Sequence, residues 1–208
     1  MIHSRFQQRG LYAITDGPRG DLPDAVAQAL AGGARVLQYR DKTADAMRRH
    51  AEALALKRLC DAHAVPLIIN DDVALAVAVG AAGVHLGRDD DDLAAARAVL
   101  GAGAIIGVSC YDSLERARTA AAAGADYIAF GAFFPSPTKP DAARASPDLL
   151  RQSATLGLPR VAIGGITPDN APSLVEAGAD FLAVISAVFA AADVRAAAQR
   201  FARLYPFD

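Results

Sequence analysis

Short apolar runs recur along the chain at regular intervals, and a stretch with helical spacing separates each run from the next. The runs are nearly unbroken, which is typical of strands buried on both faces of a parallel sheet. We predict eight strands, at residues 11–16, 35–40, 66–71, 83–87, 105–110, 127–130, 160–165 and 181–186.

The intervening segments predict helices that begin and end at recognisable residues. Ser113 and Ser146 are placed as N-caps, and Pro147 suits a first helical position. Gly33, Gly124 and Gly178 mark helix ends. The predicted helices cover residues 22–33, 44–63, 73–79, 93–100, 113–123, a segment from 146, 167–177 and 194–203.

Eight strand–helix units are the number found in a (β/α)₈ TIM barrel, and we predict this α/β fold. The barrel is expected to form a single domain over residues 1–208, with residues 1–10 as a lead-in. A doubly wound open sheet is the alternative. The even spacing of the units argues against it, as does the lack of a Gly-x-Gly-x-x-Gly sequence after the first strand.

Composition narrows the class of protein. Of the 208 residues, 53% are hydrophobic, which supplies a large core and excludes a disordered chain. The net charge of −2 gives no bulk attraction to nucleic acid or to an anionic membrane. No apolar stretch is long enough to span a bilayer, and residues 1–8 lack a secretory signal. We therefore expect a cytoplasmic protein, with a homo-oligomer as one open state, that binds neither nucleic acid nor membrane.

The cysteines and histidines give no sign of nucleophilic or metal chemistry. Two cysteines are too few for a disulfide scaffold, and Cys110 ends an apolar run, as a small buried residue does. His85 lies inside the fourth predicted strand, where we favour a structural histidine with a satisfied ring nitrogen over a catalytic one. Neither a His/Cys metal spacing nor a Ser-His-Asp order is present.

Polar and glycine residues follow the predicted strands at their carboxyl ends, where a barrel builds its site. So many at one rim are hard to explain by packing, and we expect them to line a common site. They are Gln38, Arg40, Lys42, Asn70, Asp71, Asp89, Asp90, Ser109, Ser136, Thr138, Lys139, Gly164, Gly165 and Ser186.

The loop after the sixth predicted strand carries the chemistry of a phosphate site. Its two prolines shape the loop, and Ser136, Thr138 and Lys139 supply two hydroxyl donors and a cation. Gly164 and Gly165 would let backbone amides approach a second phosphate. A proline-rich surface loop with a solvated lysine is the alternative.

Cations and carboxylates are expected at the same rim, which predicts a diphosphate bound together with a metal ion. The carboxylates would repel a diphosphate unless a hard divalent cation lies between them, and the oxygens of Asp71 and Asp90 suit Mg²⁺. Asp71 could instead be a helix N-cap, and residues 89–92 a solvated first helical turn. The cations are Arg40, Lys42 and Lys139.

With these residues in place, the chain resembles the thiamine-phosphate synthase family over nearly its whole length. The resemblance rests on five motifs that are specific as a set. They are Gln38-Tyr39-Arg40-Asp41-Lys42, Ile69-Asn70-Asp71, Gly83-Val84-His85-Leu86-Gly87, Pro135-Ser136-Pro137-Thr138-Lys139 and Ile163-Gly164-Gly165-Ile166.

The resemblance implies a role for each matching position. Hydroxymethylpyrimidine diphosphate would be held by Gln38, Tyr39, Arg40, Asp41, Lys42, Asn70, Ser109 and Lys139. Thiazole phosphate would be held by Ser136, Pro137, Thr138, Gly165, Ile185 and Ser186. One Mg²⁺ per subunit would be held by Asp71 and Asp90, with Asp89 open as the second ligand. The chain departs from the family at Arg88, often glutamine, and at Ser136, often threonine.

The implied reaction is a Mg²⁺-dependent condensation of the two substrates into thiamine phosphate and pyrophosphate, by dissociative displacement at the pyrimidine methylene. Its expected catalytic residues are Arg40, Lys42, Ser109 and Lys139. A thiazole tautomerase-like protein or a non-catalytic regulatory phosphate-binding barrel is the alternative. A protein that binds only thiazole phosphate would not need the residues of the diphosphate and metal half, which disfavours both.

Overall fold

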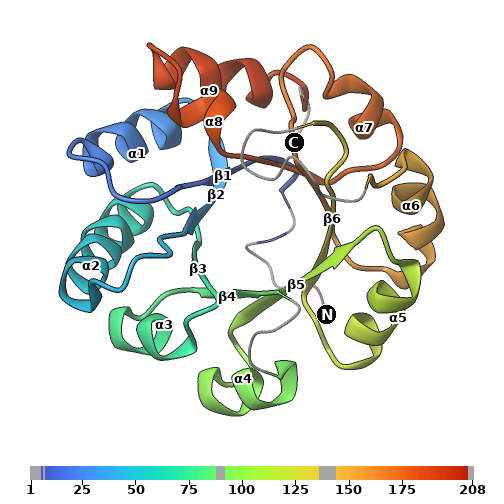
Figure 1. Ribbon diagram of the computed structural model, residues 1–208, viewed down its shortest axis with the longest axis horizontal. Helices are drawn as coiled ribbons and strands as arrows, with labels where there is room; N and C mark the ends of the chain where they lie inside the picture. Colours follow the sequence, from blue (N-terminus) through green and yellow to red (C-terminus); the bar gives the residue numbers. More distant parts are fainter. Residues whose placement is uncertain (1–5, 7, 88–91, 136–143, 206–208) are drawn as a thin grey trace.

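Eight parallel strands form a closed barrel in the computed structural model, which describes residues 6, 8–87, 92–135 and 144–205 (Figure 1). Each strand pairs with the next in sequence, and β8 pairs with β1 to close the ring. The strands are β1 Gly10–Ile14, β2 Ala34–Tyr39, β3 Leu67–Asn70, β4 Gly83–Leu86, β5 Ile105–Tyr111, β6 Tyr127–Phe130, β7 Arg160–Ile163 and β8 Phe181–Val184. The predicted TIM barrel is confirmed.

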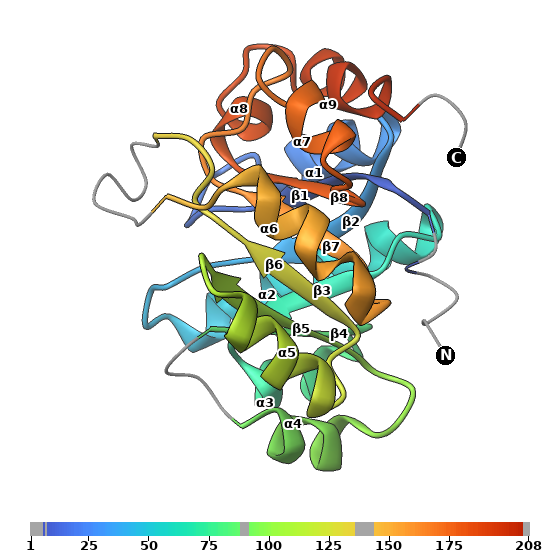
Figure 2. The same ribbon diagram turned by 90° about the vertical axis from the view of Figure 1, so that its right-hand side faces the viewer.

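Helices surround the barrel on its outside (Figures 1 and 2). They are α1 Leu22–Ala31, α2 Ala46–Ala62, α3 Val73–Val79, α4 Leu93–Leu100, α5 Leu114–Ala122, α6 Pro147–Gln152, α7 Pro172–Glu176, α8 Ser186–Phe189 and α9 Val194–Ala202. The N-caps predicted at Ser113 and Ser146 are confirmed, because each side chain accepts a backbone N–H of its own helix. In the described ranges no helix is long and apolar enough to cross a membrane.

The structure corrects the prediction for the helix before β8. That helix was expected to begin at Thr167, but α7 begins at Pro172. Thr167 and Asn170 instead close a turn: the Thr167 N–H donates to Asn170 Oδ1 at 2.9 Å and the Asn170 N–H donates to Thr167 Oγ1 at 3.4 Å. Two short elements were not predicted, α8 and a 3₁₀ helix at Ser153–Leu156.

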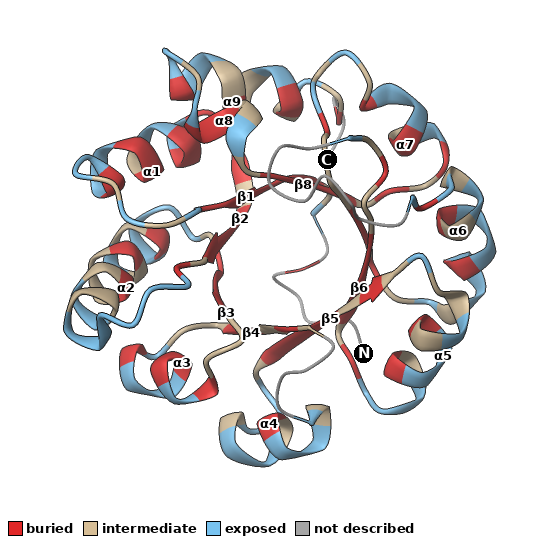
Figure 3. Cartoon of the chain, in the orientation of Figure 1, coloured by how far each residue is buried: buried red, intermediate tan, exposed pale blue. Residues whose placement is uncertain are grey.

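The strands are buried along most of their length (Figure 3). Alternation along each strand divides their apolar side chains into two cores. The outer core lies between strands and helices and includes Leu37, Ile69 and Leu182. The inner core fills the barrel and includes Tyr12, Tyr127 and Phe181. At the lead-in, the Phe6 ring stacks on Tyr127 with centroids 4.6 Å apart and lies 4.8 Å from the Phe181 ring. The barrel is therefore a packed core rather than a pore.

The repeated Gly-Ala-Asp sequences before β6 and β8 have a structural function at the amino ends of the strands. Asp126 Oδ2 accepts the Ile106 N–H at 2.8 Å and pairs with Arg97 at 2.6 Å. Asp180 Oδ2 accepts the Arg160 N–H at 2.9 Å and pairs with the same residue's guanidinium at 3.1 Å. Each carboxylate thus holds the start of its own strand to the neighbouring strand, at the amino ends of the barrel and opposite the predicted site.

Asp126→Ala is therefore expected to lower the free energy of unfolding by about 2 kcal/mol, because the backbone N–H of the buried Ile106 loses its acceptor and Arg97 loses its carboxylate partner. Urea unfolding measures the loss. Asp61→Ala is the matched control, since the exposed Lys57–Asp61 pair is worth less than about 1 kcal/mol. Equal losses in the two variants would contradict a structural role for the Asp126 carboxylate.

Candidate active site at the carboxyl ends of the strands

Two cations at the carboxyl end of β2 are held by carboxylates from the neighbouring strand ends. Arg40 pairs with Asp16, which follows β1, and Lys42 pairs with Asp71, which follows β3. Asn70 Nδ2 donates to the same Asp71 oxygen, Oδ2, at 2.6 Å. Four predicted site residues, Arg40, Lys42, Asn70 and Asp71, thus lie at one part of the rim. Asp16 and Asp71 compensate the charges of the two cations.

Asp71 adopts a left-handed backbone conformation, with φ of 63°, which is uncommon for a residue other than glycine. The helix N-cap is its neighbour Asp72, whose side chain accepts the Leu75 N–H at 2.8 Å. The N-cap alternative for Asp71 is therefore wrong. Its carboxylate is directed to the polar groups of the rim rather than to α3.

The donors at this position suit Mg²⁺, which takes one or two carboxylates and completes its shell with phosphate oxygens and water. Asp71 supplies one carboxylate that serves no helix. Within the described part of the chain, no group of three or more His, Cys, Asp or Glu residues could hold a metal alone. The described residues therefore fit a Mg²⁺ that shares its ligands with a substrate, not a closed structural site.

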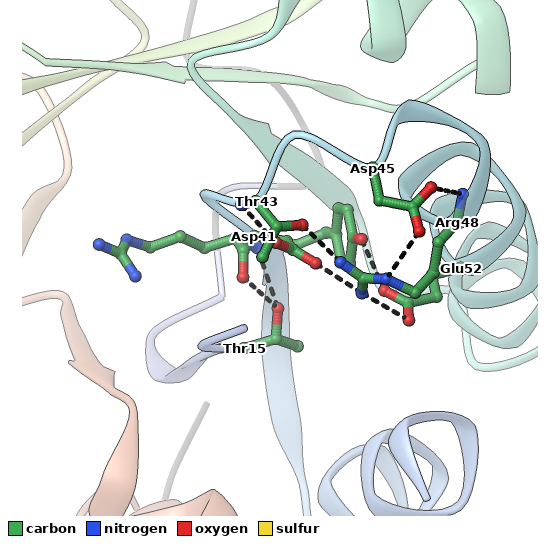
Figure 4. A network of polar contacts seen from close by, with 8 residues as sticks. Thr15, Asp41, Thr43, Asp45, Arg48 and Glu52 are labelled. Atoms are coloured by element: carbon green, nitrogen blue, oxygen red, sulfur yellow. Dashed lines mark hydrogen bonds and ion pairs between the residues drawn. The ribbon is translucent and has the colours of Figure 1, made fainter. Parts of the chain in front are cut away.

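Side chains of α2 hold the loop after β2 in shape (Figure 4). The Asp41 carboxylate, fully shielded from solvent, pairs with Arg48 at 2.7 Å and accepts the Thr43 N–H at 2.8 Å. Burial opposes ionisation, but the Thr43 and Arg48 contacts outweigh it and lower the pKa of Asp41. Tyr39 donates its hydroxyl to Glu52 at 2.7 Å. Asp41 and Tyr39 thus face the helix layer, where they support Arg40 and Lys42.

A chain of hydrogen bonds crosses the barrel interior beneath the rim. Gln38 Nε2 donates to the Tyr12 hydroxyl at 2.8 Å, and the Tyr12 and Tyr127 hydroxyls are 2.7 Å apart. Tyr127 then contacts His85 Nδ1 at 2.9 Å, and His85 Nε2 contacts Ser109 Oγ at 2.8 Å. Both ring nitrogens of His85 have hydrogen-bond partners, as was expected from the sequence for one of them.

Sequence reasoning did not identify the two tyrosines of this chain. The available signal was the alternation of the strands, because Tyr12 and Tyr127 occupy the same inward parity as the predicted site residues Gln38 and Ser109. Each tyrosine, read alone in an apolar run, is indistinguishable from an ordinary core aromatic.

A cavity of about 320 Å³ opens between the carboxyl ends of β7 and β8. Three predicted thiazole-phosphate residues, Gly165, Ile185 and Ser186, line it together with Pro135. Gly165 has φ of 63°, and a Cβ there would lie 2.3 Å from the Pro135 carbonyl oxygen. Only glycine allows the two loops to approach this closely. Most residues that line the cavity are apolar, and the two glycines and the hydroxyl of Ser186 are the groups that would let an anion meet polar atoms there.

Several predicted site residues lie outside the described residues. They are Asp90 with its alternative Asp89, the departure Arg88, and the loop residues Ser136, Pro137, Thr138 and Lys139. Pro135, immediately before that loop, borders the cavity between β7 and β8. Of the acidic run 89–92, Asp92 is described, and its carboxylate caps α4 by accepting the Ala94 N–H at 3.0 Å.

The described structure offers no reactive thiol near the rim. Cys60 and Cys110 are both fully buried, and burial raises the pKa of each thiol to about 12. Both therefore stay protonated near neutral pH, and the expectation that Cys110 is a small buried residue is confirmed. A second cavity, of about 360 Å³, lies at the amino ends of β3 to β5 and includes none of the predicted site residues.

Comparison with known proteins gives a consistent result. Residues 11–188 match the family model described as thiamine monophosphate synthase. The thiamine-phosphate synthase of Xanthomonas campestris pv. campestris is 62% identical over 195 residues, covering 93% of this chain and 94% of the relative. The corresponding protein of Nitrosococcus oceani is 55% identical over 202 residues, covering 95% of this chain and 93% of the relative.

Two solved structures have the same fold as this chain. Thiamine phosphate pyrophosphorylase from Pyrococcus furiosus superposes with a TM-score of 0.87 at 36% identity, covering 97% of each chain. The (S)-3-O-geranylgeranylglyceryl phosphate synthase of Thermoplasma acidophilum superposes with a TM-score of 0.73 at 18% identity, covering 98% of this chain and 96% of that one. This second likeness concerns the fold alone.

Proposed function

The chain belongs to the thiamine monophosphate synthase family, and we propose that it condenses hydroxymethylpyrimidine diphosphate with thiazole phosphate. The products are thiamine phosphate and pyrophosphate, so the protein is a transferase. The observation that carries the proposal is the presence, on one rim, of two separate regions whose residues suit an anion. One consists of the charged residues after β2 and β3, and the other is the glycine-bordered cavity between β7 and β8.

The pyrimidine diphosphate is assigned to the first region. Arg40 and Lys42 are paired there with Asp16 and Asp71, and these pairs are half-exposed. A diphosphate offers both cations more acceptor oxygens than a single carboxylate does, so substrate binding would exchange their partners. The exchange would release the Asp71 carboxylate. Lys139 adds a third cation in the family pattern.

The released Asp71 carboxylate, together with Asp90, would hold one Mg²⁺ on the diphosphate. The ion supplies charge neutralisation of the pyrophosphate leaving group. Asn70 already donates to Asp71 and would keep its carboxylate oriented, as groups behind a metal ligand commonly do.

The reaction proceeds at the methylene carbon of the pyrimidine. Its bond to the diphosphate oxygen breaks, and the bonding electrons leave with pyrophosphate, whose charge Arg40, Lys42 and Lys139 stabilise. The thiazole nitrogen then donates its lone pair to the cationic methylene and forms the new C–N bond. This route needs no protein nucleophile or strong base, so the protein contributes orientation and charge.

The thiazole phosphate is assigned to the second region. Gly165, Ile185 and Ser186 border the cavity, and in the family pattern the loop residues Ser136, Pro137 and Thr138 complete it. Backbone amides and a hydroxyl would bind the phosphate there without a strongly charged side chain. The two substrates therefore approach each other across the carboxyl-terminal mouth of the barrel.

A direct assay tests the proposal. The purified protein is incubated with both substrates, with Mg²⁺ or with EDTA, and thiamine phosphate and pyrophosphate are quantified together. We expect equal amounts of the two products with Mg²⁺, and a rate at least about a hundredfold lower with EDTA, because a leaving-group charge loses its counterion. Added Mg²⁺ should restore the rate.

Two other outcomes have distinct meanings. Equal rates with and without the metal would contradict the Mg²⁺ site while leaving the condensation intact. No product, combined with measurable binding of thiazole phosphate, would indicate a tautomerase-like or regulatory barrel instead.

A further inference from the structure

The hydrogen-bond chain inside the barrel connects two residues that the family resemblance assigns to the pyrimidine diphosphate. It begins at Gln38 on β2, passes through Tyr12 on β1, Tyr127 on β6 and His85 on β4, and ends at Ser109 on β5. The three middle residues have no assigned role in substrate binding. Their hydrogen bonds nevertheless determine how both ends present their polar atoms.

The direction of donation along the chain follows from its first member. Gln38 Nε2 can only donate, so the Tyr12 oxygen accepts from it. Tyr12 and Tyr127 are 1% and 0% exposed, and burial raises the pKa of both phenols well above their ordinary value. Each phenol therefore keeps one proton to donate.

Donation then runs in one direction to the rim. Tyr12 donates to Tyr127, and Tyr127 donates to His85 Nδ1. A neutral imidazole that accepts at Nδ1 carries its proton on Nε2, so His85 donates to Ser109 Oγ. The Ser109 oxygen is an acceptor in this pair, and its own O–H remains for another partner.

The opposite direction is unfavourable. If Tyr127 donated to Tyr12, the Tyr12 oxygen would accept from both Gln38 and Tyr127. The Tyr12 proton would then have no acceptor among the hydrogen bonds that the described residues make. A buried donor without an acceptor is costly, so the direction from Gln38 to Ser109 is preferred.

We propose that His85, together with Tyr12 and Tyr127, is a positioning group that turns the Ser109 hydroxyl into a hydrogen-bond donor toward the pyrimidine diphosphate. The group selects a substrate that presents an acceptor atom, such as a ring nitrogen, above Ser109. The inference rests on the proposed function, because Ser109 can donate to the pyrimidine diphosphate only if the protein binds that substrate.

The first test measures the tautomer of His85 in the wild-type protein by ¹⁵N NMR of the imidazole nitrogens. Four histidines are present, and the His85 signals are assigned by their loss in His85→Gln. We expect a neutral ring protonated at Nε2. Protonation at Nδ1, or a doubly protonated ring, would overturn the proposal, and this measurement needs no variant to be active.

The second test removes one hydroxyl from the middle of the chain. Tyr127→Phe keeps the ring that stacks on Phe6 but deprives His85 Nδ1 of its donor. We expect the dissociation constant for the pyrimidine diphosphate to rise about tenfold, the scale of one lost hydrogen bond, with that for thiazole phosphate within about twofold of wild type. An equal loss of affinity for both substrates, or no loss for either, would overturn the proposal.

A double-mutant cycle separates positioning from general destabilisation. In a Ser109→Ala background, Tyr127→Phe should weaken binding of the pyrimidine diphosphate no further, because the positioning group acts through Ser109. Additive losses of affinity in the double variant would contradict the positioning role. Tyr205→Phe is the matched control, since that buried hydroxyl donates to the Ala179 carbonyl at the amino ends of the strands, and both affinities should stay unchanged.

The two proposals fail in different ways. If the wild-type protein forms no thiamine phosphate, the proposed function fails, but the tautomer of His85 still tests the direction of the chain. If thiamine phosphate is formed and His85 is protonated at Nδ1, only the positioning role fails.

Discussion

Asp71→Asn is expected to lower kcat/KM for thiamine phosphate formation by about 10²–10³-fold, or roughly 3–4 kcal/mol of transition-state stabilisation. The substitution removes the one described carboxylate of the rim that contacts both Lys42 and Asn70. Asparagine tolerates the left-handed backbone that this position requires, with φ of 63°, so the charge changes with little added strain. The loss should therefore report on metal and diphosphate binding rather than on folding.

The neighbouring residue supplies the control. Asp72→Asn keeps a good N-cap for α3, since asparagine caps helices as well as aspartate does. We expect its kcat/KM to stay within about threefold of wild type, because uncharged capping preserves α3. Steady-state kinetics at saturating Mg²⁺ measures both variants. Similar losses at positions 71 and 72 would mean that the activity depends on the start of α3 and not on a specific carboxylate.

Gly165→Ala is expected to raise KM for thiazole phosphate at least about tenfold and to leave KM for the pyrimidine diphosphate nearly unchanged. The new Cβ would lie 2.3 Å from the Pro135 carbonyl oxygen and 2.7 Å from that of Phe134, so one of the two loops has to move. Both loops border the cavity between β7 and β8. A shift of about 1 Å there is enough to misplace the amides that would bind the phosphate.

Gly157→Ala separates this clash from backbone strain. Gly157 has nearly the same φ, 67°, but a Cβ there has nothing within 4 Å. Both variants should lose about 1 kcal/mol of stability from the left-handed conformation. Only Gly165→Ala should change substrate affinity. If Gly157→Ala raises KM for thiazole phosphate as much as Gly165→Ala does, backbone strain rather than the clash between the loops causes the loss of affinity.

The sequence was sufficient for the fold because its signal is repeated eight times. Each apolar run is short and ambiguous, but the alternation with helices leaves one common architecture, and errors at the ends of single elements do not affect it. The late start of α7 illustrates such an error: the Thr167–Asn170 turn uses the same hydroxyl and amide chemistry as a helix cap, so local sequence does not distinguish them.

Prediction of the site was limited by contacts between distant strands. The rim residues Arg40, Lys42, Asn70 and Asp71 follow from the position of strand ends, which sequence gives directly. Which of two adjacent aspartates caps α3 depends on one backbone angle, and no residue pattern reports it. The hydrogen-bond chain through Tyr12 and Tyr127 depends on the register of the strands around the whole barrel. That register is a property of all eight strands together, so a single run does not contain it.

Closure of the barrel between β1 and β8 has a consequence for the order of folding. The contacts at this seam join residues about 170 positions apart, and Tyr12 meets Tyr127 across 115 positions. Contacts between such distant residues form late, because the intervening chain must first lose its conformational entropy. Until β1 docks, Gln38 and Tyr127 both lack their hydrogen bonds to Tyr12. The hydrogen-bond chain through Tyr12 and Tyr127 is thus expected to be among the last contacts to form during folding.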